Sequence, residues 1–192
     1  MTDEPVETFY SEERWGNWID RIREEELDPE SEDSARLLLN LQDDAAIAVA
    51  KVVSAFDEGR LDEERTLAEL TDIREIVLSE VELADEEKLM LVDGVQTSLV
   101  PVFYAAEEYV VAGVTADAAL DDLVRSAVDA ETDEELETAL GFVVQAGTLV
   151  FDGAQLDMSI VEEIEYGLVA EWLNGLDSLQ SALSDPEVVE ED

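Results

Sequence analysis

The chain has 192 residues, a length that suits one domain or two small ones. Lys and Arg number 10 against 52 Asp and Glu, so the formal net charge is −42, yet 46% of the residues are hydrophobic. This apolar content excludes a disordered acidic chain, and the lack of Cys and His excludes disulfides, zinc sites built on those residues and histidine-based catalytic triads.

The negative charge is spread along the whole chain, which predicts a protein of a salt-rich cytoplasm. The Debye length falls from about 10 Å at 0.1 M salt to about 3 Å at 1 M, so screening weakens the repulsion between carboxylates. We therefore expect solvent cations at high concentration around the protein, and no cofactor. No secretory signal is visible. Charged residues interrupt the apolar stretch Leu89–Ala112, and Gly141–Phe151 is shorter than the roughly 20 residues that a membrane span needs. We therefore expect no membrane insertion.

The N-terminal half predicts three helices. Ser11 caps the first, which runs to about Glu26 and ends before Asp28-Pro29. Its apolar stripe has helical spacing and consists of Trp15, Trp18, Ile19 and Ile22. The second starts near Ser31 or Asp33 and ends before Gly59, and the side chains expected on its polar face are those of Arg36, Asn40, Asp44 and Lys51. Asp62 opens the third, whose inward side chains are Leu70, Ile73, Val77 and Val81.

The C-terminal half predicts four more helices. Asp85 opens one that continues to about Ala112, with a kink at Pro101 and a stop at Gly113. Another runs from Thr115 to about Ala130, and a capping box of Thr132 and Glu135 starts the next, which ends at Asp152-Gly153. The last begins at Asp157 or at a second box, Ser159 and Glu162, and continues with a bend at Gly175 to about Leu183.

Together these patterns predict an all-α fold, a single bundle-like domain of six to eight mostly antiparallel helices over residues 9–184. Residues 1–8 and 185–192 are expected to be flexible ends. Three stretches rich in Val and aromatic residues leave a strand alternative open: Leu99–Tyr104, Tyr109–Val114 and Phe142–Phe151.

Motifs for the commoner enzymes are absent from the sequence: it has no phosphate-binding glycine loop, no dinucleotide fingerprint and no nucleophile elbow. Glu162 and Glu165 lie three residues apart and suggest one half of a Mg²⁺ site of an all-helical phosphohydrolase. A second, inward-facing pair is not evident, and with 52 carboxylates a solvated surface explains such pairs better.

The first predicted helix is the most distinctive segment. Arg14, Trp18 and Arg21 fall on one face at i, i+4 and i+7, a combination that suits cation–π packing and protein-binding hot spots. The alternative is that Trp15 and Trp18 simply anchor this helix on the core. Three arginines meet six carboxylates between Glu12 and Glu26, so we expect no direct binding of nucleic acid.

Three stretches of the chain resemble a haloarchaeal family of acidic helical proteins of unassigned function. They are residues 13–21, which begin with Glu13-Arg14-Trp15-Gly16-Asn17-Trp18, then Leu27–Arg36 and Leu37–Asp44. The resemblance lies mainly in residues 9–58. It implies an archaeal, salt-rich cytoplasm and transfers no catalytic or binding residue.

The sequence therefore leaves three alternative functions open. The leading one is a non-catalytic adaptor, regulator or assembly protein that binds another protein through Arg14, Trp18 and Arg21. The second is a Mg²⁺-dependent hydrolase of a nucleotide or related phosphate, with Glu162 and Glu165 as metal ligands. The third is self-association through the apolar fourth and sixth helices. An adaptor predicts an exposed apolar or aromatic patch, whereas a hydrolase predicts carboxylates that converge in a pocket.

Overall fold

The computed structural model describes residues 9–28, 30–114, 118–164 and 167–184. Over these residues the chain forms eight α-helices and no strand, so the predicted all-α class is confirmed and the strand alternative is wrong. The predicted flexible ends, residues 1–8 and 185–192, lie outside the described residues, as does the predicted helix start at Thr115.

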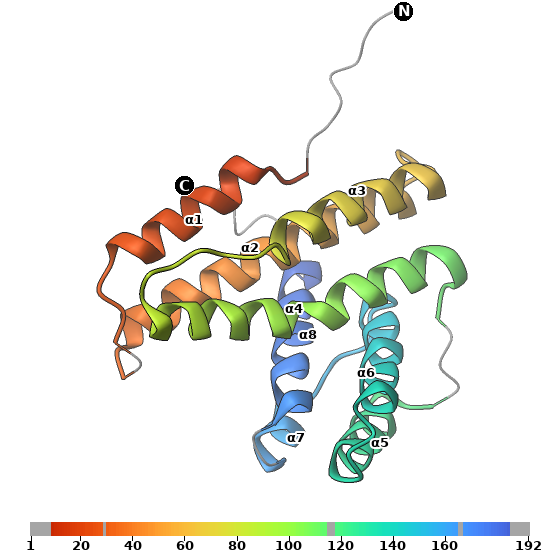
Figure 1. The fold of residues 1–192 in the computed structure, drawn as a ribbon. Coiled ribbons are helices and arrows are strands. Elements are labelled where there is room, and N and C mark those ends of the chain that lie inside the picture. Colours follow the sequence, from red (N-terminus) through yellow and green to blue (C-terminus); the bar gives the residue numbers. More distant parts are fainter. Residues whose placement is uncertain (1–8, 29, 115–117, 165–166, 185–192) are drawn as a thin grey trace, which may run out of the picture.

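The helices form two groups that cross each other (Figure 1). In chain order they are α1 (Glu12–Glu24), α2 (Glu32–Asp57), α3 (Glu63–Val77), α4 (Glu86–Ala112), α5 (Leu120–Thr132), α6 (Leu136–Phe151), α7 (Met158–Glu163) and α8 (Leu168–Ser184). Helices α1 to α4 run in alternating directions, while α5, α6 and α8 lie across them (Figure 1). One continuous apolar core extends from Tyr10 to Ala182.

Most helix ends follow signals that lie next to them in the sequence. The side chain of Ser11 accepts a hydrogen bond from the Arg14 backbone N–H at 3.2 Å, and Asp62 accepts one from Arg65 at 2.7 Å. Asp85 caps α4 in the same way. Gly113 ends α4 with φ +71°, a left-handed conformation that glycine adopts without strain.

The capping boxes predicted at Thr132 and Ser159 are wrong. Helix α5 continues through Thr132, and α6 begins at Leu136 without a side-chain cap. Helix α7 is capped by Asp157, the other residue considered for this start. The single last helix is divided into α7 and α8, because α7 ends at Glu163 and α8 begins only at Leu168.

The start of α8 is capped from a distant part of the chain. The carboxylate of Glu131, on α5, accepts the backbone N–H groups of Leu168 at 2.7 Å and of Val169 at 3.3 Å. These N–H groups have no partner within their own helix, so the carboxylate takes the place of an N-cap residue. A contact across 37 residues cannot be read from local spacing, which explains why this helix start was missed.

Helix α4 is the central helix of the core. It packs against α2, α3, α6 and α8, and its buried side chains include Leu99, Val102 and Phe103. Pro101 lies in its middle, and the helix changes direction about half-way along (Figure 1). By length and composition alone α4 would suffice to cross a membrane, and half of its most apolar segment is buried inside the protein.

Helices α4 and α8 cross at very short range. A Cβ placed on Gly175 would lie 1.8 Å from the Ser98 carbonyl oxygen, so only glycine fits there. The predicted bend at Gly175 is not a break in the helix, because α8 is continuous through this residue; the glycine instead allows α4 and α8 to pack closely. Beside the crossing, the buried Gln42 amide donates to Ser178 Oγ at 2.8 Å and its oxygen lies 2.8 Å from Ser98 Oγ, which links α2, α4 and α8.

Candidate functional site

A buried carboxylate organises the predicted aromatic–arginine cluster on α1. Asp44, on α2, is 3% exposed and accepts hydrogen bonds from Arg14 Nε at 2.8 and 3.1 Å and from Trp18 Nε1 at 3.0 Å. A terminal guanidinium nitrogen of Arg14 also contacts this carboxylate. The prediction that Asp44 lies on the polar face of its helix is wrong. The arginine and the indole compensate for its burial, as a charge withdrawn from water requires.

Tyr10 and Trp15 complete the contact of α1 with the core. Both are buried, and the Tyr10 hydroxyl has no hydrogen-bond partner of good geometry among the described residues. Burial first, and then the negative charge of Asp44, raise the pKa of Tyr10 far above its ordinary value. This phenol therefore stays protonated. The cluster as a whole docks α1 on the rest of the protein.

The outward side of the same cluster is a small hollow of about 160 Å³, lined by Arg14, Asn17, Trp18 and Arg21. The Arg21 guanidinium lies 5.7 Å from the centre of the Trp18 ring, a cation–π distance, and its Nε bonds Glu25 at 3.0 Å. The structure thus brings the three predicted partner-binding residues together. Two of them also direct polar atoms inward to Asp44, and their binding of a partner stays a prediction.

The predicted metal ligands are only partly described. Glu162 lies on the short helix α7, whereas Glu165 falls outside the described residues. Within the described part of the chain, no group of three or more Asp or Glu side chains is arranged to hold a metal ion. The described residues therefore add no support to the hydrolase alternative.

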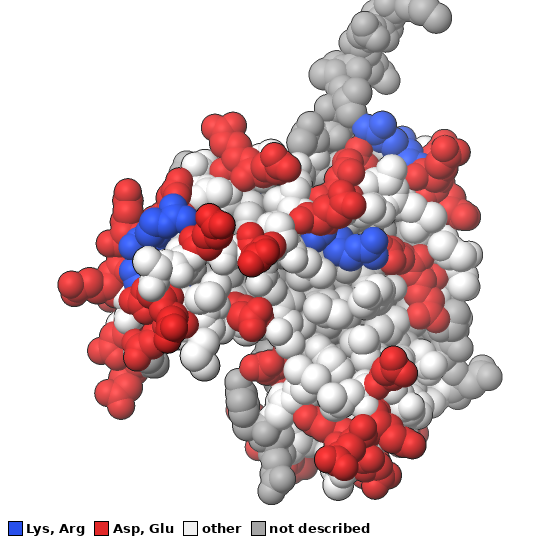
Figure 2. Space-filling model, in the orientation of Figure 1, with Lys and Arg blue, Asp and Glu red and all other residues white. Residues whose placement is uncertain are grey.

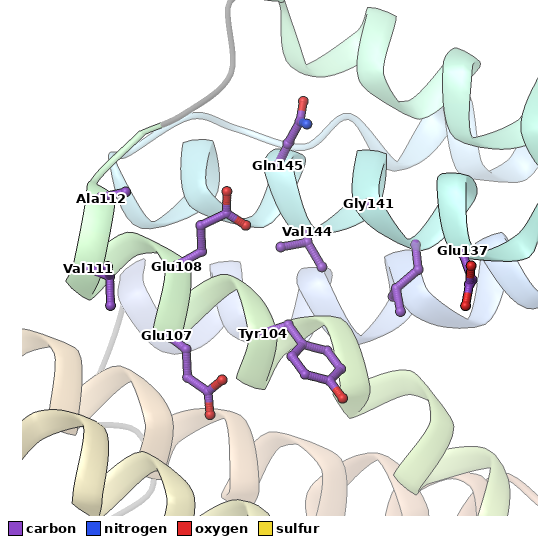
Figure 3. Close-up of a pocket in the computed structure, with 10 residues that line it drawn as sticks. Tyr104, Glu107, Glu108, Val111, Ala112, Glu137, Gly141, Val144 and Gln145 are labelled. Carbon is purple, nitrogen blue, oxygen red and sulfur yellow. The ribbon is translucent and has the colours of Figure 1, made fainter.

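A second and larger site is an open groove of about 610 Å³ between α4 and α6. The α4 side consists of Tyr104, Glu107, Glu108, Val111 and Ala112, and the α6 side of Glu137, Leu140, Gly141, Val144 and Gln145. In Figure 3, Glu108 points from α4 toward α6 and Val144 points from α6 toward α4. The two helices are packed against each other, so the groove follows the seam between them.

The groove combines exposed apolar side chains with glutamates. Among the lining residues, Val111 is 59% and Tyr104 44% exposed. On the face shown in Figure 2, uncharged surface lies between groups of carboxylates. Of the glutamates, Glu107 forms an ion pair with Arg74 of α3 at 2.5 Å. A groove lined by apolar side chains and a few polar groups is the usual form of a binding site.

From the sequence, α4 and α6 are the apolar fourth and sixth helices expected to mediate self-association, and the groove between them is not predicted. A usable signal was present: Tyr104, Glu107, Glu108 and Val111 follow one another at i, i+3, i+4 and i+7, which places them on one helix face. Two glutamates on a face with a tyrosine and a valine indicate that the face is not part of the core. Which helix would lie beside it depends on the tertiary fold.

These features define a strongly acidic all-helical protein with an apolar groove between two packed helices. The chain belongs to an archaeal family of uncharacterised conserved proteins, DUF2150, whose model matches residues 8–192. The expected resemblance to an archaeal family is thereby confirmed. No curated protein and no solved structure matches the chain.

Proposed function

We propose that this protein is a non-catalytic adaptor or assembly protein of a salt-rich archaeal cytoplasm, and that it acts by binding another protein. The observation that carries the proposal is the groove between α4 and α6, where Tyr104 and Val111 are exposed beside Leu140 and Val144. Burying such side chains against a partner removes apolar surface from water, which drives most protein association.

The charge of the protein supports the salt-rich setting. With a net charge of −42, self-repulsion opposes the compact state at low ionic strength, and dissolved cations relieve it. The same charge disfavours nucleic acids and anionic membranes as partners. The free energy gained by burying apolar surface, in contrast, increases with the concentration of salts whose anions are excluded from protein surfaces. A partner in this setting is therefore best held by apolar contact.

Affinity capture from cells lysed in about 2 M KCl tests the proposal, because the protein's charge is screened at that concentration. The wild type is compared with Val111→Asp, which places a charge in the groove. Met90→Asp is the matched control, since Met90 is exposed on the same helix but outside the groove. We expect a specific partner that the wild type and Met90→Asp retain and Val111→Asp loses.

A third variant separates the two surfaces. Arg21→Ala removes a side chain of the α1 hollow that forms no hydrogen bond or ion pair with Asp44 among the described residues. If Arg21→Ala loses the partner and Val111→Asp keeps it, the α1 hollow is the binding surface and the groove is not. If no protein depends on either residue, the adaptor proposal is contradicted.

A further inference from the structure

The shape of the groove fits one more helix. On α4 its lining residues occupy positions 104, 107, 108, 111 and 112, and on α6 positions 137, 140, 141, 144 and 145. Both sets follow the spacing i, i+3, i+4, i+7 and i+8, so each is one continuous helix face. Each face is about 12 Å long, or roughly two turns. Two such faces side by side form a seam into which the side-chain ridge of a third helix packs.

At Gly141 no side chain projects from α6 into the groove. A Cβ placed on this residue would meet no atom within 4 Å, although the residue lies inside α6. Glycine weakens a helix interior relative to alanine, so the structure of α6 itself does not require it. The missing side chain lets another backbone approach between Leu140 and Val144.

The charges of the groove select its occupant. Three glutamates and no Lys or Arg line it: Glu107, Glu108 and Glu137. Arg74 neutralises part of the Glu107 charge from the side of α3. Within the described structure Glu137, in the first turn of α6, forms no ion pair with a basic residue. A partner that fills the apolar floor therefore gains further from positive groups on its flanks.

The other candidates carry the wrong charge. A second copy of the chain would bring its own three groove glutamates against these. The end segments of the chain are also acidic, with three carboxylates in residues 1–8 and five in residues 185–192. Like charges placed opposite each other in an interface disfavour binding.

From shape, floor and charge together, we infer that the groove binds an amphipathic α-helix of a partner protein. This helix has small or apolar residues at i, i+3 or i+4 and i+7, and Arg or Lys on both flanks of that stripe. The inference rests on the proposed adaptor function and specifies the partner's binding element.

Designed peptides test this chemistry without knowledge of the partner. One probe is a labelled helix of about five turns, long enough to cover the groove, with a Leu and Ala stripe flanked by Arg. A second has the same stripe flanked by Glu, and a third has the composition of the first with the stripe scrambled. Binding is measured by fluorescence anisotropy in about 2 M KCl, where longer-range attraction to the acidic surface is screened and only charge pairs in direct contact distinguish the peptides.

We expect the first peptide to bind at least about tenfold more tightly than the other two. Gly141→Leu fills the groove floor and should weaken that binding by about tenfold or more, with a melting temperature no lower than that of the wild type. Gly94→Leu is the matched control, because Gly94 also lies inside a helix with no atom within 4 Å of an added Cβ, and it is not part of the groove.

Equal binding of the scrambled or Glu-flanked peptide would overturn the inference, as would equal loss in Gly141→Leu and Gly94→Leu. If none of the peptides binds, the inference falls as well. Capture of a partner that depends on Val111 would in that case leave the adaptor function standing, so the two failures are distinguishable.

Discussion

Trp18 donates its indole N–H to the buried carboxylate of Asp44 at 3.0 Å, and this bond joins the first helix to the second. Asp44→Ala removes the acceptor for Trp18 and Arg14 together. Hydrogen bonds to a charged group contribute about 1.5–3 kcal/mol, and we expect a loss of that size in the free energy of unfolding. Chemical denaturation in high salt measures it, and tryptophan fluorescence should shift to the red as α1 loosens.

Asp20→Ala is the control for this prediction. Asp20 bonds Arg23 on the same helix, at an exposed position. Exposed ion pairs contribute about 0–1 kcal/mol, so this change should have little effect. If Asp44→Ala costs no more than Asp20→Ala, the docking role of Asp44 is contradicted.

The α4–α8 crossing predicts opposite effects for two glycines. Gly175→Ala would place a Cβ against the Ser98 carbonyl and force the helices apart. Overpacking of this kind costs about 1–3 kcal/mol or more. Gly94→Ala meets no atom and should stabilise the protein by about 0.5–1 kcal/mol, because alanine is the better helix former. Thermal unfolding of both variants checks the signs, and a neutral Gly175→Ala would rule out the close crossing.

Two half-buried carboxylates predict a pH dependence. Burial raises the pKa of Asp43, on α2, a hydrogen bond from the Ser178 hydroxyl opposes the rise, and the negative charge of Asp177, on α8, adds to it. Burial also raises the pKa of Asp177. Because both folded pKa values exceed the unfolded value of about 3.9, the charged forms destabilise the fold at neutral pH. This penalty disappears as pH falls through the raised values.

The double variant Asp43→Asn with Asp177→Asn should therefore melt at a higher temperature than the wild type at pH 7. The gain should shrink on acidification and vanish near pH 4, about the ordinary value of the carboxyl pKa. Asp157→Asn provides a control of opposite sign, since hydrogen bonds from Ser159 lower the pKa of Asp157. A gain that does not change with pH would contradict this linkage.

Local signals predicted much of the fold. The caps at Ser11, Asp62 and Asp85 and the stop at Gly113 depend on neighbouring residues, and the structure has them where the sequence placed them. Asp44 was misplaced because helical periodicity shows which face is polar and does not reveal a partner helix that brings an arginine. The Glu131 cap, the Gly175 crossing and the groove likewise depend on contacts between residues far apart in the chain.

The acidic surface predicts a dependence on salt. Helicity and the melting temperature should both rise as KCl increases from about 0.1 M to 2 M, since screening shortens the range of repulsion. Circular dichroism follows both. A variant with Glu24, Glu26 and Glu30, all exposed, changed to Gln should show a shallower rise. Full helicity with an unchanged melting temperature at the lowest salt would show that the fold does not need screening.

Hydrogen–deuterium exchange of the protein, alone and with its captured partner, tests the adaptor proposal most directly. We expect slower exchange, on binding, of backbone amides in residues 104–112 and 137–145, because a bound partner covers the groove and steadies both helices. The α1 segment from Arg14 to Arg21 should be unchanged. Protection confined to α1, or no protection in either groove helix, would contradict the assignment of the groove as the binding surface.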